Sequence, residues 1–430
     1  MYRQVASLVV FREFGGDSIL ERLAAISREL SGEYDRDELR GRVYAEVKRL
    51  LDLATEYGFD ENLWQDYLTF LLLTNENSFS LTAEKRALGD GSIGVLVRQD
   101  MAVFRELFHF DFEPLERALG LDCFSILTHY RAVPKEKKHY FDNISRAVRE
   151  MSGKLAAAAD GEEMFALLSE FYRANGVGMF GLNRAFRIRE GEGHAEIYPI
   201  NNTDEVRLSD LVGYELQKER LIRNTESFLA GGRANNVLLY GDAGTGKSTS
   251  VKAILNEYAG EGLRMIEIYK HQFRMLTDII GQIKRRNYKF IIFMDDLSFE
   301  EFEIEYKYLK AVIEGGVESR PDNVLIYATS NRRHLIRESF GDRADDVHRT
   351  DSMAEKTSLA DRFGVSILFA TPDKPEYHEI VKFLAAKHPE LTLQEEELLA
   401  RADSWAVRNG GISCRTAQQF INDLLTEVTR

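Results

Sequence analysis

Residues 241–248 read Gly-Asp-Ala-Gly-Thr-Gly-Lys-Ser and match the pattern G-x-x-x-x-G-K-[ST]. They lie between a short apolar run, residues 236–240, and a segment to Tyr258 that can form a helix. Glycines let consecutive backbone N–H groups turn toward one anion, and the start of a helix adds positive potential. A chance glycine-rich turn is the alternative, but a strand before the loop and a helix after it favour a phosphate-binding loop in an α/β sheet.

The side chains of this loop indicate which anion binds. Lys247 is expected to contact the β- and γ-phosphates, and the Ser248 hydroxyl to ligate Mg²⁺. We therefore expect ATP and Mg²⁺ as ligands. The predicted phosphate-binding residues are Gly241, Asp242, Ala243, Gly244, Thr245, Gly246, Lys247, Ser248 and Thr249.

Two further apolar runs end in polar residues suited to the same site. Residues 290–294 are followed by Asp295 and Asp296, and residues 324–328 by Thr329, Ser330 and Asn331. Asp295 is expected to hold the magnesium through water, and Asp296 to act as general base on the attacking water. Asn331 can hydrogen-bond the γ-phosphate. The alternatives are that the two aspartates cap a helix and that the asparagine is a turn residue.

The rest of the pattern predicts three parts. Residues 1–200 form a mostly α-helical domain, because apolar residues recur at spacings of three and four, and it ends in a β-hairpin around residues 186–200. Residues 204–370 alternate short apolar strands with helices, which predicts a parallel α/β sheet covered on both faces as the nucleotide-binding core. Residues 371–430 are helical again and form a lid.

Composition narrows the classes of function. The formal net charge is −14, which argues against broad electrostatic binding of nucleic acid, although a local basic groove stays open. Cys123 and Cys414 are the two cysteines and lie far apart, which fits a reducing cytosol. The start of the chain does not resemble an export signal, and no stretch is apolar enough to span a bilayer. We expect a cytoplasmic protein with no membrane contact.

From about Leu208 to the C-terminus these elements, in this order and spacing, resemble the AAA+ ATPases. The resemblance implies a P-loop sheet with a helical lid, and makes residues 241–248 Walker A, Asp295 and Asp296 Walker B, and Asn331 sensor 1. Residues 211–215, Leu-Val-Gly-Tyr-Glu, look like the family's loop near the adenine. Gly213 and Tyr214 are therefore expected to contact the nucleotide.

The same resemblance assigns two arginines. Arg362, in Leu-Ala-Asp-Arg-Phe-Gly, takes the place of the arginine finger, and Arg415, in Gly-Gly-Ile-Ser-Cys-Arg-Thr-Ala, that of sensor 2. A finger points into the neighbouring subunit's ATP site, which implies a homo-oligomeric ring, often of six subunits. Most AAA+ proteins carry Asp-Glu at Walker B, whereas Asp-Asp here is similar to the bacterial replication initiators and leaves the hydrolysis rate open. The whole chain looks like an uncharacterised bacterial family of predicted AAA+ ATP-binding proteins.

These expectations describe an ATPase that hydrolyses ATP at a subunit interface to remodel or load a protein or nucleic-acid client. A slow ATP-dependent switch, whose N-terminal domain binds a partner in one nucleotide state, is the alternative. Phe273 is a weak candidate for an exposed client-threading aromatic, and a core position is the simpler interpretation. The basic clusters at residues 284–286 and 332–333 are either solvated or contacts to nucleic acid or an acidic partner.

Overall fold

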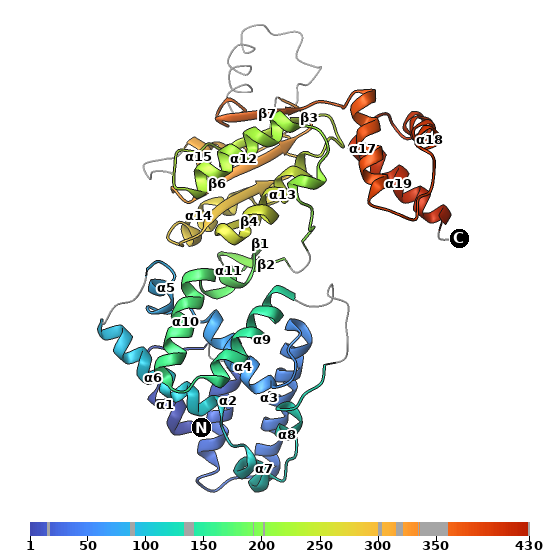
Figure 1. Ribbon diagram of the computed structural model, residues 1–430. Coiled ribbons are helices and arrows are strands. Elements are labelled where there is room, and N and C mark those ends of the chain that lie inside the picture. Colours follow the sequence, from blue (N-terminus) through green and yellow to red (C-terminus); the bar gives the residue numbers. More distant parts are fainter. Residues whose placement is uncertain are drawn as a thin grey trace. The chain divides into compact units, whose positions relative to one another are not determined.

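The computed structural model describes residues 1–14, 18–86, 91–132, 142–191, 193–200, 203–299, 303–314, 321–333, 335 and 360–428. The chain divides into two compact units (Figure 1). Unit 1 comprises Met1–Asn183 with Pro199–Asn202, and unit 2 comprises Arg184–Tyr198 with Thr203–Arg430. Each unit is described by itself.

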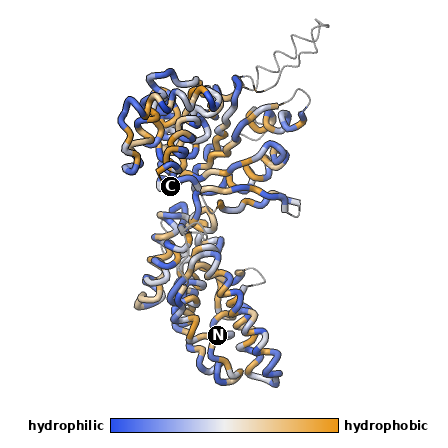
Figure 2. Tube along the Cα trace, turned by 90° about the vertical axis from the view of Figure 1, so that its right-hand side faces the viewer, coloured by the Kyte–Doolittle hydropathy of each residue, from blue (hydrophilic) through white to orange (hydrophobic). Residues whose placement is uncertain are grey.

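Unit 1 is helical, as the spacing of its apolar residues predicts. Asp35 caps one long helix by accepting hydrogen bonds from the amides of Asp37 and Glu38, and Gly58, at φ 68°, ends that helix in the left-handed region. Blue and orange alternate along the helices in Figure 2, as expected for amphipathic segments with one buried face. The helices are α1 (Tyr2–Ser7), α2 (Ile19–Glu29), α3 (Arg36–Tyr57), α4 (Leu63–Thr74), α5 (Ser80–Ala83), α6 (Ser92–Phe108), α7 (Glu113–Leu119), α8 (Phe124–Leu127), α9 (Asp142–Ala157), α10 (Gly161–Asn175) and α11 (Gly178–Leu182).

Unit 2 contains a seven-stranded sheet in the order β2-β1-β4-β5-β6-β3-β7. From β1 to β7 neighbouring strands pair in parallel, and the register sets Met294 of β5 opposite Ala328 of β6. The carboxyl ends of β3, β5 and β6 therefore meet at one edge of the sheet. The strands are β1 (Ala185–Glu190), β2 (Ala195–Pro199), β3 (Val237–Gly241), β4 (Leu263–Glu267), β5 (Lys289–Met294), β6 (Val324–Ser330) and β7 (Val365–Phe369).

The β-hairpin belongs to the sheet of unit 2 and not to the helical domain. The sequence places it at the end of the helical domain, but β1 pairs with β4 and so extends the sheet of unit 2. The alternation of Phe186 and Ile188 with arginines is that of a strand buried on one face, and both are buried. Local alternation identifies a strand but does not identify the sheet that it joins.

Helices cover the sheet, and a lid follows it. The helix α13, which follows the phosphate loop, packs against β4 and β6, and α12 packs against β7. The lid has its own core, in which Tyr377, Val381 and Phe420 are buried. The helices of unit 2 are α12 (Glu215–Leu229), α13 (Lys247–Tyr258), α14 (Leu276–Ile283), α15 (Glu305–Glu314), α17 (Lys374–Ala386), α18 (Glu395–Arg408) and α19 (Cys414–Val428), with short 3₁₀ segments at Leu208–Asp210, Ala259–Glu261 and Lys270–Met275.

The predicted fold class is confirmed: a P-loop α/β sheet carries a helical lid and follows a mostly helical N-terminal region. Strands β5 and β6 are buried almost throughout, as near-continuous apolar runs predict for central parallel strands. In the described part of the chain, no helix combines the length and the apolar character that crossing a bilayer requires.

Candidate functional site

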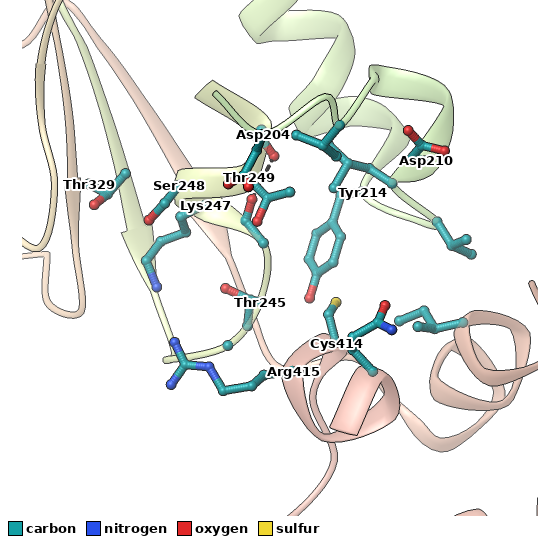
Figure 3. Close-up of a pocket in the computed structure, with 18 of the residues that line it drawn as sticks. Asp204, Asp210, Tyr214, Thr245, Lys247, Ser248, Thr249, Thr329, Cys414 and Arg415 are labelled. Carbon is teal, nitrogen blue, oxygen red and sulfur yellow. Dashed lines mark hydrogen bonds between the residues drawn. The ribbon is translucent and has the colours of Figure 1, made fainter. Parts of the chain in front are cut away.

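A cavity of about 1070 Å³ lies at the carboxyl edge of the sheet, beside the lid (Figure 3). Its wall combines the glycine-rich loop, the segment from Asp204 to Tyr214, and the lid helices α17 and α19. The predicted site residues in its lining are Tyr214, Ala243, Gly244, Thr245, Gly246, Lys247, Ser248, Thr249, Asp295, Asp296, Asn331 and Arg415. Gly213, Gly241, Asp242 and Arg362 are not part of that lining.

The loop depends on glycine at three positions. Gly241, Gly244 and Gly246 have φ values of 133°, 77° and 90°, which L side chains rarely adopt. At Gly241 an added Cβ would also lie 2.0 Å from the carbonyl oxygen of Phe369. These angles turn the loop back on itself immediately before α13, so that the loop backbone and the N-terminus of α13 face the same cavity.

Lys247 is buried at the centre of the loop. Its Nζ donates to the carbonyl oxygens of Gly241 and Asp242, at 2.9 and 2.6 Å, and to Asn331 Oδ1 at 3.1 Å. Burial lowers the pKa of this ammonium, while Asp242, Asp296 and Asp295 act in the opposite direction. The Lys247 ammonium is thus hydrogen-bonded both to the loop and to Asn331, which follows β6.

Asp295 accepts hydrogen bonds from two hydroxyl groups on different segments. Its Oδ1 accepts from Ser248 Oγ and from Thr329 Oγ1, each at 2.5 Å. The Thr329 hydroxyl in turn accepts from the amide of Asp296 at 2.9 Å. Sequence reasoning did not single out Thr329; the signal that identifies it is a hydroxyl residue at the buried end of the strand next to the Asp295 strand.

Asp296 has a left-handed backbone, with φ 51°. Only three described residues other than glycine have a positive φ, and two of them, Asp296 and Tyr214, lie at this cavity. Aspartate tolerates this region better than most residues, although it stores some strain there. The Asp296 Oδ1 accepts from Asn331 Nδ2 at 2.7 Å, so Asn331 joins Lys247 to Asp296.

The donor set fits a magnesium–triphosphate. Mg²⁺ prefers oxygen ligands and is usually held by one or two carboxylates together with substrate phosphates. Ser248 Oγ and Asp295 Oδ1 supply hard oxygens beside the loop, and Lys247 supplies the cation that a terminal phosphate requires.

The other end of the cavity is less polar. Tyr214 stacks on Phe369 with ring centroids 5.0 Å apart and donates its hydroxyl to the carbonyl oxygen of Ala370 at 2.7 Å. Burial raises the pKa of Tyr214, and Figure 3 shows its hydroxyl beside Cys414. Val212, Ile380 and Leu384 complete an apolar wall on which an aromatic base can stack. Gly213, at φ 76°, makes the turn that leads into Tyr214.

The two arginines occupy different places. The Arg415 amide donates to the carbonyl oxygen of Gly244 at 3.1 Å, and Figure 3 shows its guanidinium on the side of the loop where the Lys247 ammonium lies. Arg362 is half-buried just before β7 and is not among the residues that line its own chain's cavity. Phe273 is buried and packs on Phe299, so it is a core residue and not an exposed threading aromatic.

Comparisons with known proteins match different lengths of this chain. Residues 182–428 match the sequence model of a family described as "Protein of unknown function (DUF815)". Replication factor C large subunits match over 74 residues: that of Methanococcus vannielii is 32% identical, covering 17% of this chain and 15% of the relative, and that of Staphylothermus marinus is 38% identical, covering 17% of each. The chain thus spans less than a fifth of these relatives.

Two solved structures are similar at low scores. The Thermotoga maritima RuvB Holliday junction branch migration motor has 16% identity and a TM-score of 0.36, over 52% of this chain and 66% of that one. The Aeropyrum pernix Orc1 protein in complex with DNA has 17% identity and a TM-score of 0.38, over 51% and 62%. At these scores neither structure is a basis for assigning a function.

Proposed function

This chain belongs to the DUF815 family of proteins of unknown function, and we propose that it binds ATP with Mg²⁺ and hydrolyses it at a subunit interface. One observation carries the proposal: Asn331 hydrogen-bonds both Lys247 and Asp296, within one cavity of a glycine-rich phosphate loop. A cation for the terminal phosphate and a carboxylate for the attacking water are thereby joined through one side chain.

Each residue has a defined task in this proposal. Lys247 and the loop amides neutralise the phosphates, and Arg415 adds charge from the lid. Asp296 accepts the proton of the attacking water, and Asn331 orients both the carboxylate and the water. Ser248 and Asp295 hold Mg²⁺, which neutralises charge on the phosphates when bound. Tyr214 and the apolar wall hold the base.

Arg362 is the reason to place hydrolysis at an interface. It lies outside its own chain's cavity, whereas charge stabilisation of the transferred phosphoryl group requires contact with that group. We propose that it completes the site of a neighbouring copy, in a homo-oligomeric ring with six subunits as the first expectation. The cysteine content and the lack of membrane-type segments in the sequence lead us to place this assembly in the cytoplasm.

The client is a protein or a nucleic acid that the ring remodels or loads. Relatives named as replication factor C subunits favour testing nucleic acid, and the net charge of −14 favours testing a protein. The exposed side chains of Arg332 and Arg333 at the end of β6 are the local basic cluster to test first.

A slow nucleotide switch is a second candidate, and one observation favours it. One oxygen of Asp296 already accepts a 2.7 Å hydrogen bond from Asn331, and its side chain is one methylene shorter than the glutamate usual at Walker B. The hydrogen bond occupies one carboxylate oxygen, and the shorter side chain reaches less far toward a water molecule at the γ-phosphate. In that case ATP binding, rather than turnover, changes which partner unit 1 binds.

A steady-state ATPase assay over a range of protein concentrations separates the two candidates. Turnover that rises with self-association and requires Mg²⁺ supports the ATPase, whereas tight ATP binding with negligible turnover supports the switch. Lys247→Ala should weaken ATP binding roughly 30-fold or more, because losing a charge-assisted contact costs about 2–5 kcal/mol. Lys307→Ala, an exposed change on α15, is the matched control. Wild-type protein that binds no nucleotide would refute both candidates.

A further inference from the structure

The segment that joins the sheet to the lid is short, and two of its residues are held neither by a proline ring nor as a helix cap. Strand β7 ends at Phe369 and α17 begins at Lys374. Within this connection the ring of Pro372 fixes its φ, and Asp373 is held as the cap of α17, accepting from the amide of Glu376 at 2.8 Å. Rotation of the lid against the sheet therefore depends mainly on Ala370 and Thr371.

Both of these residues are hydrogen-bonded to other parts of unit 2: Ala370 to Tyr214, which lines the cavity, and Thr371 to Asp242 of the phosphate loop. The Ala370 carbonyl oxygen accepts from Tyr214 Oη at 2.7 Å. One oxygen of Asp242 accepts both the Thr371 amide, at 3.1 Å, and the Thr371 hydroxyl, at 2.7 Å. These bonds lower the pKa of Asp242, so the carboxylate is the form that the hinge favours.

Asp242 connects the hinge to the phosphate loop in a second way. Its own amide donates to the carbonyl oxygen of Phe369 at 3.2 Å, and the adjacent Gly241 packs so closely on Phe369 that no side chain fits. The Asp242 carbonyl oxygen, on the other side, accepts from Lys247 at 2.6 Å. One residue thus contacts the phosphate-binding lysine through its carbonyl group and the hinge through its side chain.

The lid returns to the same loop at its far end. The amide of Arg415, in the first turn of α19, donates to the Gly244 carbonyl oxygen at 3.1 Å. The loop is therefore fastened to the lid at two points, through Asp242 to the hinge and through Gly244 to α19. A change in the loop backbone shifts both points.

We propose that the Asp242–Thr371 contact is a positioning device that couples the phosphate loop to the lid, so that nucleotide in the loop sets the angle at which α19 presents Arg415. This inference rests on the proposed binding of ATP. The Asp242 side chain does not line the cavity, so it acts on the nucleotide through Thr371 and the hinge. The sequence pattern for a phosphate loop leaves this position unspecified, and here an aspartate fills it.

The test uses the full chain with Thr371→Val, Thr371→Ser and Asp242→Ala. Valine keeps the size of threonine and removes the hydroxyl, whereas serine keeps the hydroxyl. Hydrogen exchange is followed in peptides covering residues 368–376 and 413–420, without and with ATP, and ATP affinity is measured by titration. We expect Thr371→Val to weaken ATP binding about two- to tenfold, the range for one lost hydrogen bond, and to reduce the ATP-dependent protection of residues 413–420. Thr371→Ser should behave as wild type.

A double-mutant cycle distinguishes coupling through the Asp242–Thr371 contact from a general loss of rigidity in the hinge. If the contact transmits the signal, Asp242→Ala combined with Thr371→Val should be no worse than the more severe single change. Equal losses in the serine and valine variants, additive losses in the double variant, or unchanged protection in Thr371→Val would overturn the proposal.

Failure of ATP binding in the wild type would refute the proposed function instead. The nucleotide-free arm still tests the contact, because Asp242→Ala should accelerate exchange in residues 368–376. An unchanged exchange rate there would refute the contact itself.

Discussion

Ser248 and Asp295 are hydrogen-bonded at 2.5 Å although one lies in the first turn of α13 and the other follows β5. The bond forms because β3 and β5 are parallel and both end at the same edge of the sheet, where their following loops converge. Thr329, at the end of the intervening strand β6, shares the same carboxylate oxygen. Three segments far apart in the sequence therefore build one oxygen-rich corner beside the phosphate loop.

Replacing Asp296 with asparagine should separate binding from hydrolysis. Asparagine also tolerates a left-handed backbone, so the φ of 51° is retained while the basic oxygen is lost. We expect ATP affinity to stay within about threefold and turnover to fall about 10²–10⁴-fold, the usual contribution of a general base. Nucleotide titration and a phosphate-release assay measure the two effects. Equal turnover in variant and wild type would remove Asp296 from the proposed mechanism.

Arg362→Ala should lower turnover about 10³–10⁵-fold while leaving ATP bound, if the guanidinium acts on a neighbouring subunit. Mixing this variant with Asp296→Asn provides the decisive measurement. Some interfaces in a mixed assembly then combine an intact Arg362 from one chain with an intact Asp296 from the other. We expect the mixture to recover activity that neither variant has alone, and no recovery would argue that Arg362 acts within its own chain or not at all.

Gly241→Ala should destabilise unit 2. The new Cβ would lie 2.0 Å from the Phe369 carbonyl oxygen at a φ of 133°. Overpacking and an unfavourable backbone together cost about 2–5 kcal/mol, so the unfolding temperature should fall by several degrees in calorimetry. Gly260→Ala is the control, because an added Cβ there meets nothing within 4 Å and should change stability by less than about 0.5 kcal/mol. A Gly241→Ala protein as stable as this control would contradict the packing.

Asp66 should make the stability of unit 1 depend on pH. Burial raises the pKa of this carboxyl group to about 6, above the ordinary value of 3.8, while Ser152 and the Asp60 amide oppose the shift. A carboxyl group with a raised pKa in the folded state binds its proton more tightly there than in the unfolded chain. The ionised Asp66 carboxylate therefore destabilises the folded state above about pH 6. This destabilisation decreases as the pH falls toward 4, by on the order of 2–3 kcal/mol.

Asp66→Asn removes this titration and isolates its effect. We expect the variant to be more stable than wild type at pH 7.5 and to lose that advantage by pH 4.5, in thermal unfolding at both values. Asp37→Asn, at an exposed position of α3, is the control for the loss of a carboxyl group outside the core. An advantage of Asp66→Asn that is independent of pH would indicate a packing effect instead.

Much of the fold followed from local pattern. The strand–loop–helix around Lys247, the apolar runs that became β5 and β6, and the lid helices each carry their periodicity in a continuous stretch. Chain order then placed Asp295 and Asn331 near the loop, because parallel strands end at one edge. These features depend on neighbouring residues and on one rule of sheet geometry, so the sequence by itself determined them.

The tertiary structure decided what depends on contacts between distant segments. The hairpin joins the sheet of unit 2 because β1 pairs in parallel with β4. The sequence of neither strand identifies the strand with which it pairs. Thr329 and Thr371 have no pattern of their own; each matters because a distant carboxylate accepts its hydroxyl. Hydrogen bonds of this kind form only after packing fixes both partners. The sequence therefore identifies the phosphate loop, but only the folded structure shows that Asp242 of this loop is hydrogen-bonded to Thr371 in the hinge of the lid.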